Sequence, residues 1–152
     1  MNNSKIEALA SEIQRHGEMV SLATIDMIGG CHISEHVGLT NEQLVMRQKD
    51  RGGKVCSTFD DENAVNICLS DYFEFPYTAK KLAKWVLDYS AETRLEERGF
   101  IDESNPIGRM IKKNGAILKV SGYCIVLQKV DVDYRNPHTG LPFDIVTMFC
   151  EE

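Results

Sequence analysis

Residues 29–47 read Gly-Gly-Cys-His-Ile-Ser-Glu-His-Val-Gly-Leu-Thr-Asn-Glu-Gln-Leu-Val-Met-Arg. Within this stretch Thr40 is followed three residues later by Gln43, which is the spacing of a capping box in the first turn of a helix. The stretch therefore predicts a helix that begins at about Leu39 or Thr40 and carries Leu44 toward the core.

The same stretch places a histidine and an arginine on either side of the predicted helix start. His36 comes just before the cap, and Arg47 lies two turns into the helix. Glycines near His36 let the chain bend, so that the imidazole can approach the helix face that carries Arg47. Histidine exchanges protons near neutral pH, and arginine holds a phosphate through paired hydrogen bonds. The histidine and the arginine are therefore candidate residues for cleaving a phosphodiester bond.

The rest of the chain predicts helices first and strands later, which indicates an α+β fold. Residues 4–16 have an amphipathic pattern with Ile6, Leu9 and Ile13 on one side, and residues 20–28 are ambiguous between strand and helix. We expect an extended segment over 55–59, and then a helix from Asp60 or Asp61 to about Leu69 with Ala64, Ile67 and Cys68 inward. A second helix should follow from the cap Thr78 to about Tyr89 and bury Trp85. Strands are expected near 107–112, 117–130 and 142–150, with a loop over 131–141.

Seven motifs along the chain occur in a recognisable order. They are His36-Val37-Gly38, Arg47, Ser57-Thr58-Phe59-Asp60, Trp85, Ile107-Gly108, Ile125-Val126-Leu127 and Thr147-Met148-Phe149. This series covers roughly residues 29–150. It resembles the ribonuclease A-like toxin domains at the C-termini of bacterial contact-dependent growth inhibition and related polymorphic toxins. Residues 1–28 then form an N-terminal helix and lead-in segment, and residues 29–152 form the ribonuclease A-like domain of a single globular unit.

The resemblance implies a metal-independent endoribonuclease that needs no cofactor. It implies His36, Arg47 and Thr147 as catalytic residues, and we expect Phe149, His32 and Lys49 to contact the RNA substrate. Two positions depart from the family pattern. Cys31-His32 stands where the family has His-Thr, and Phe149 stands where the family has a tyrosine, so the hydrogen bond of that phenol is absent.

The resemblance also implies partners and a place of action. We expect this chain to be the C-terminal part of a larger secreted protein, to act in the cytoplasm of a target cell, and to be blocked by a cognate immunity protein. Residues 1–5 lack the pattern of a signal peptide, and no apolar run approaches the roughly 18 residues of a membrane span. Export then depends on the longer parent.

The overall charge argues against a protein that coats nucleic acid without specificity. The net charge is −6, whereas backbone binding depends on many lysines and arginines. Positive residues nevertheless gather in two groups, which are Arg47, Lys49, Arg51 and Lys54, and then Arg109, Lys112 and Lys113. Either group can line a locally positive cleft or a solvated surface.

The five cysteines are odd in number and contain no Cys-x-x-Cys pair, so we expect no disulfide framework. Three other readings stay open for the histidines and cysteines. Cys31, His32 and His36 could bind a metal ion, but no second pair with finger spacing exists. Cys31 could be a nucleophile beside a histidine. His138, in the predicted loop, could reach the site.

Thr147 and Phe149 lie two residues apart on a predicted strand, so both side chains leave the same face while Val146, Met148 and Cys150 point the other way. A hydroxyl and a ring on one face can hold a phosphate oxygen and flank a base. The alternative for this segment is a half-buried edge strand. For the whole chain, the alternative is a noncatalytic acidic binding module, such as an immunity or inhibitor protein.

Overall fold

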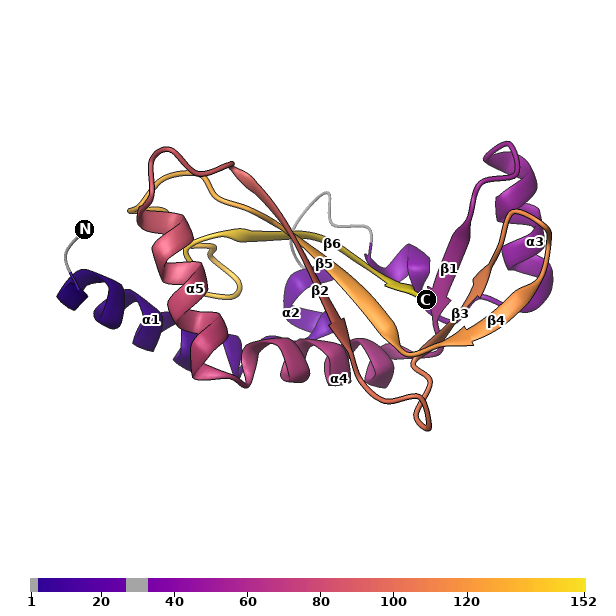
Figure 1. Cartoon of the computed structure of the whole chain (residues 1–152), viewed down its shortest axis with the longest axis horizontal. Helices are drawn as coiled ribbons and strands as arrows, with labels where there is room; N and C mark the ends of the chain where they lie inside the picture. Colours follow the sequence, from indigo (N-terminus) through magenta and orange to yellow (C-terminus); the bar gives the residue numbers. More distant parts are fainter. Residues whose placement is uncertain (1–2, 27–32) are drawn as a thin grey trace.

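The computed structural model describes residues 3–26 and 33–152 and has the predicted α+β architecture. The chain is elongated, with helices α1 and α5 at one end and helix α3 with a small sheet at the other (Figure 1). A second sheet and helix α4 connect the two ends. No helix among the described residues is long and apolar enough to cross a membrane.

The N-terminal helix α1 (Asn3–Gly17) buries Ile6, Leu9 and Ile13 as predicted. These residues belong to the same hydrophobic core as α4, α5 and the larger sheet. In the ambiguous segment 20–28, the described part forms the short helix α2 (Leu22–Asp26). The lead-in residues that the structure describes are therefore packed into the main body of the molecule.

Helix α3 (Asn41–Asp50) confirms the capping box. The Gln43 N–H donates to Thr40 Oγ1 at 3.1 Å, and the Thr40 N–H donates to Gln43 Oε1 at 2.7 Å. Leu44 is fully buried against Cys56 and Ile111 in a small separate core. A 3₁₀ turn, η1 (Ile33–His36), precedes the helix.

Two helix predictions need correction. Asp61 caps α4 (Glu62–Phe73) through a 2.8 Å bond from the Ala64 N–H, but the helix continues past Leu69. Ile67 is 42% exposed rather than inward, because about 100° per residue places it on the side of α4 opposite the buried stripe. Helix α5 (Pro76–Leu87) begins two residues before the predicted cap Thr78. Pro76 suits this first position because its fixed φ is helical and its missing N–H has no helical partner.

The strands form two antiparallel sheets of three strands each, in the orders β1-β3-β4 and β2-β5-β6. The first contains β1 (Cys56–Phe59), β3 (Gly108–Ile111) and β4 (Ile117–Val120), and the second contains β2 (Arg94–Phe100), β5 (Gly122–Gln128) and β6 (Asp144–Glu151). The single extended segment predicted over 117–130 is thus two strands in different sheets, separated at Ser121.

The two sheets meet where Gly108 passes the end of β6. A Cβ at Gly108 would lie 2.3 Å from the Thr58 carbonyl oxygen and 2.6 Å from Cys150 Sγ, so only glycine fits there. The Cys150 thiol in turn donates to that carbonyl at 3.1 Å. This close approach holds β1 of one sheet beside β6 of the other, and the candidate site lies at that junction.

Candidate active site

A cavity of about 360 Å³ opens between the end of η1, the end of α3, strand β1 and strand β6. We call it the site cavity. Its lining residues are His36, Arg51, Val55, Cys56, Ser57, Met110, Phe149, Cys150 and Glu151. Two of the predicted site residues, His36 and Phe149, therefore meet here although they lie at opposite ends of the family-like motif series.

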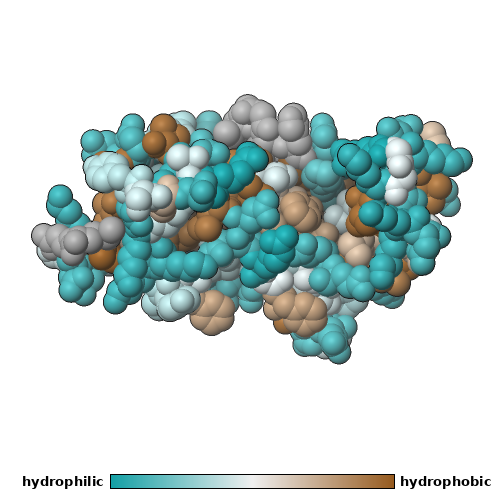
Figure 2. Space-filling view, turned by 45° about the horizontal axis from the view of Figure 1, so that its top comes forward, coloured by the Kyte–Doolittle hydropathy of each residue, from teal (hydrophilic) through white to brown (hydrophobic). Residues whose placement is uncertain are grey.

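In a space-filling view, hydrophilic side chains cover most of one face and apolar ones show between them along its middle (Figure 2).

The backbone around His36 is fixed to strand β1. Val37 forms a parallel bridge with Phe59, and the Gly38 N–H donates to the Phe59 carbonyl at 2.8 Å. Gly38 has φ +71°, a conformation that other residues adopt at a cost. Its backbone therefore turns from the His36 segment into the cap of α3.

Thr58 supports the same segment from the strand side. Its side chain is fully buried, and its Oγ1 accepts the Leu39 N–H at 3.0 Å. The hydroxyl proton can go to either of two carbonyls, Phe59 at 3.0 Å or His36 at 3.3 Å. The family-like motif Ser57-Thr58-Phe59-Asp60 thus has a structural reason, which is to hold the chain at His36 and in the three residues that follow it.

Arg47 reaches His36 across the helix start, as the sequence predicts. Its Nη1 lies 3.4 Å from His36 Nδ1 and donates to the Glu35 carbonyl at 2.8 Å. Both side chains are partly exposed. Both contacts use Nη1 alone, whereas a guanidinium has five N–H donors in a planar fork. The arrangement can present arginine hydrogen bonds and an imidazole to one phosphate group.

Strand β6 carries the predicted Thr147 and Phe149 on one face, both half-buried. The opposite face is formed by Ile145, Met148 and Cys150, which are buried. Val146 does not share that face as predicted, because the pairing with β5 shifts there. Val126 is paired with Thr147 and Leu127 with Ile145, which leaves Val146 as a bulge. Phe149 lines the site cavity, and Thr147 lies two residues before it on the same side of the strand.

Two other residues considered from the sequence, Lys49 and His138, do not line the site cavity. Lys49 is exposed and does not line the site cavity, since two residues along a helix turn a side chain by about 200° from Arg47. His32 and Cys31 fall outside the described residues. His138 is exposed in the predicted loop, which is fastened to α1 by the 2.7 Å ion pair between Arg135 and Glu12. That loop lies at the α1 end, whereas β1, which contributes Cys56 and Ser57 to the site cavity, lies toward the other end (Figure 1).

The second basic group of the sequence is largely used inside the structure. Arg109 lies 3.5 Å from Asp60 and donates to Asn41 Oδ1 and to the Leu39 carbonyl, so it fastens the start of α3 to β3. Lys112 pairs with Glu152 at 3.2 Å. From the first group, Arg51 lines the site cavity. The sequence placed Arg51 in a basic group that could line a cleft but not among the named site residues, although its i, i+4 spacing from Arg47 was a usable signal.

Cys150, which lines the site cavity, is poorly suited to be a nucleophile. Cys150 is buried, and this burial raises the pKa of its thiol to about 11, so the reactive thiolate is scarce at neutral pH. Burial likewise raises the pKa of Cys124, which is paired with Phe149 across strands β5 and β6, to about 11. Within residues 3–26 and 33–152, no three His, Cys, Asp or Glu side chains are grouped to hold a metal ion.

Comparison with known proteins agrees with this geometry. The family model of the bacterial CdiA-CT RNase A domain matches residues 30–149. A chain of the CdiA-CT/CdiI complex from Y. kristensenii 33638 has a similar fold, with a TM-score of 0.63, 21% identity, and coverage of 79% of this chain and 97% of that one. No curated protein sequence matches. The match over most of the chain shows that this protein belongs to the bacterial CdiA-CT RNase A domain family and is a toxin ribonuclease domain of contact-dependent growth inhibition.

Proposed function

We propose that the domain cleaves RNA without a metal ion, by attack of a ribose 2′-hydroxyl on the adjacent phosphorus. The 2′-oxygen loses its proton and bonds to phosphorus, the bond to the 5′-oxygen breaks, and that oxygen takes a proton. The products are a 2′,3′-cyclic phosphate and a 5′-hydroxyl. DNA lacks the attacking hydroxyl and is not a substrate.

The contact between His36 and Arg47 beside the site cavity is the observation that carries this proposal. His36 exchanges a proton as general acid or base, and Arg47 neutralises the charge that develops on the phosphoryl oxygens. An imidazole and a guanidinium this close can act on the same phosphate. His32, which we expect to contact the RNA substrate, lies outside the described residues.

Strand β6 supplies the proposed contacts to the rest of the nucleotide. Thr147 donates a hydrogen bond to a non-bridging oxygen, and Phe149 packs beside ribose or base. The placement of Phe149 in the site cavity supports this role, because its ring edges the space that a nucleotide would occupy. Lys49, as an exposed cation on α3, has no such support from its location.

We also propose that the domain is exported within a larger protein, acts in the cytoplasm of the target cell, and is neutralised by a cognate immunity protein. The similar solved structure is a complex of a CdiA-CT chain with CdiI, which supports the existence of such a partner here. Residues 1–28 would precede the ribonuclease domain of 29–152.

The proposal is tested by incubating the purified domain with RNA, and separately with single-stranded DNA, in the presence of EDTA. We expect the RNA to be degraded and the DNA to survive, and a His36→Ala variant to be roughly 100- to 10,000-fold slower. Cleavage that stops on chelation and returns with a divalent ion would contradict the metal-free mechanism. A wild-type protein inactive on RNA under all conditions would favour the binding-module alternative.

A further inference from the structure

We propose that Arg51 binds the phosphate next to the scissile one, so that the domain holds two consecutive phosphates of a single RNA strand. This inference rests on the proposed cleavage at His36 and Arg47. It adds a substrate contact at the end of α3, in a residue to which the reaction chemistry itself gives no role.

The position of Arg51 follows from the end of helix α3. Arg51 is the C-cap residue, four positions after Arg47, so the two arginines lie on one helix face about 6 Å apart along the axis. Consecutive phosphates of an extended RNA strand have a comparable separation. A strand that places its scissile phosphate at Arg47 therefore brings a neighbouring phosphate within reach of Arg51.

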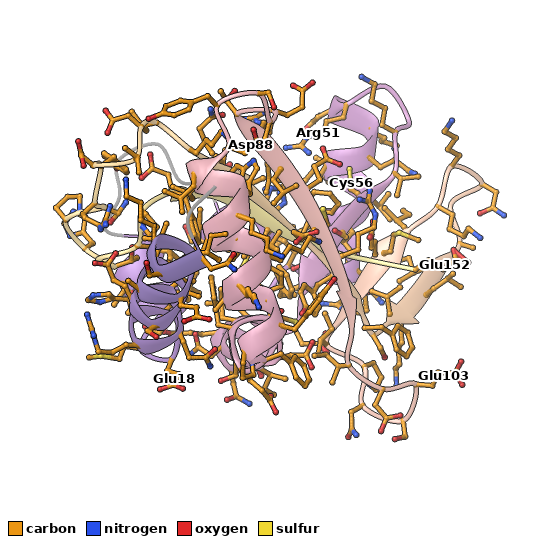
Figure 3. The ribbon with its side chains drawn as sticks, turned by 60° about the vertical axis from the view of Figure 1, so that its left-hand side comes forward. Glu18, Arg51, Cys56, Asp88, Glu103 and Glu152 are labelled. Atoms are coloured by element: carbon orange, nitrogen blue, oxygen red, sulfur yellow. The ribbon has the colours of Figure 1, made fainter. Side chains whose placement is uncertain are left out.

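The same cavity joins Arg51 to the proposed chemistry. Arg51 lines the site cavity together with His36 and Phe149. Figure 3 shows Arg51 near Cys56, the first residue of β1, which also lines this cavity. An arginine on a remote surface of the helix would not share these neighbours.

The charge of Arg51 is available for a ligand. Its side chain is exposed, and no carboxylate of the described residues lies within ion-pair distance of it. The acidic residue in the site cavity, Glu151, pairs with Arg98 at 3.0 Å. The capping of α3 uses the backbone N–H of Arg51, so the helix end does not need the guanidinium.

The test uses a short 2′-O-methyl strand that contains one ribonucleotide, chosen as one that the wild-type domain cleaves in ordinary RNA. Only this nucleotide has a free 2′-hydroxyl, so cleavage occurs at one fixed linkage. In two further strands, the linkage on one or the other side of the scissile phosphate is replaced by an uncharged methylphosphonate. The value of kcat/KM is measured for the wild type and for Arg51→Ala on each strand.

We expect one methylphosphonate to lower kcat/KM of the wild type by about 10-fold, the loss of one charge-assisted contact. The Arg51→Ala variant should be about 10-fold weaker on the unmodified strand and insensitive to that methylphosphonate, with the change mainly in KM. Arg51→Lys should recover part of the sensitivity. Arg15→Ala removes an exposed arginine in the last turn of α1 that does not line the site cavity, and it should behave as the wild type.

An Arg51→Ala variant that stays as sensitive as the wild type to both methylphosphonates would overturn the inference while leaving the cleavage reaction intact. Absence of RNA cleavage by the wild type would instead defeat the proposed function. If the domain cleaves only long RNA, the short strands cannot be used. The association constant K of that RNA for the His36→Ala variant is then measured at increasing salt concentration. Adding Arg51→Ala should then reduce the slope of log K against log salt by about 0.7, and an unchanged slope would also overturn the inference.

Discussion

Arg47 Nη1 lies 3.4 Å from His36 Nδ1, across the 11 positions that separate them and the turn into helix α3. Arginine has no acceptor, so this contact is a hydrogen bond only in the histidine tautomer that carries its proton on Nε2. In the proposed reaction Nε2 is then the nitrogen that exchanges a proton with substrate, while Arg47 orients the ring and binds the phosphate.

The two residues should each be necessary for cleavage but not for folding. His36→Ala and Arg47→Ala should lower kcat by roughly 100- to 10,000-fold, the usual contribution of acid-base and electrostatic catalysis. Circular dichroism and the unfolding midpoint should stay near those of the wild type. If His32→Ala costs more activity than His36→Ala, the imidazole assigned here to the reaction is the wrong one.

The left-handed backbone at Gly38 gives a second prediction. A Cβ there would have space, since its nearest neighbour is the Asp60 carbonyl oxygen at 4.0 Å, so the cost of Gly38→Ala is conformational. We expect the free energy of unfolding to fall by roughly 1–2 kcal/mol, measured with urea. Asparagine adopts this conformation more readily, so Gly38→Asn should lose less. Equal stability of alanine and glycine at this position would contradict the argument.

The ring at position 149 gives a third prediction, about substrate contact. Phe149 borders the site cavity and is only half-buried, so the hydroxyl of Phe149→Tyr has room to reach phosphate or base. Activity on RNA should be kept or raised. Phe149→Ala removes the ring and should raise KM. A Phe149→Tyr variant that loses activity together with stability would show that the ring is needed as core.

Alkaline pH should weaken the fold through the buried thiols. Burial raises the pKa of Cys124 and Cys150 from 9.0 to about 11, and that of Cys68 to about 12. Above pH 9 the unfolded chain releases these protons while the folded chain keeps them. Stability present below pH 9 is therefore lost as the pH rises toward 11, by up to roughly 1.4 kcal/mol per pH unit for each thiol.

The measurement is urea unfolding between pH 8 and pH 11 with a reducing agent present. Cys124→Ala should show a shallower fall of the free energy of unfolding with pH, whatever its stability at pH 8. A pH dependence identical to that of the wild type would mean that this thiol does not contribute.

A cognate immunity protein should protect a cell that makes this domain. Arg47, Arg51 and the neighbouring lysines Lys49 and Lys54 give the site end a local positive charge on an otherwise acidic chain. An acidic inhibitor surface would be steered there, and its association rate should fall as salt increases. Expression of the domain alone should stop bacterial growth, and co-expression of the adjacent open reading frame should restore it. If expression of the wild-type domain does not slow growth, and the wild type is as stable as His36→Ala, the prediction of a toxic domain with an immunity protein is wrong.

Features that depend on a few neighbouring residues could be predicted from the sequence, whereas features that depend on contacts between distant segments could not. The capping box of Thr40 is read from four residues, and so the approach of His36 to Arg47 could be predicted. Strand β2 was missed because its half-buried positions include Glu97 in place of an apolar residue. That carboxylate pairs with Lys81 at 2.7 Å and accepts the Tyr72 hydroxyl at 3.2 Å. Neither partner is visible from a pattern within the strand.

The division of 117–130 between two sheets and the bulge at Val146 also depend on distant strands. Ser121 lies between β4, which is paired with β3, and β5, which is paired with β2 and β6, and no local periodicity distinguishes these two strands. The place of Arg51 in the site follows from the same packing, since β1 and β6 form the other walls of the site cavity. For these features the sequence carries the residue types, and the fold decides which of them meet.

The measurement that tests the central claim most directly is the chemistry of the cleaved ends. RNA digested by the wild-type domain in EDTA is analysed by mass spectrometry, with His36→Ala and Arg47→Ala digests as controls. We predict fragments ending in 2′,3′-cyclic phosphate with 5′-hydroxyl partners, formed by the wild type and nearly absent from both controls. Fragments with 5′-phosphate and 3′-hydroxyl ends, or equal cleavage by the His36→Ala variant, would contradict the proposed reaction.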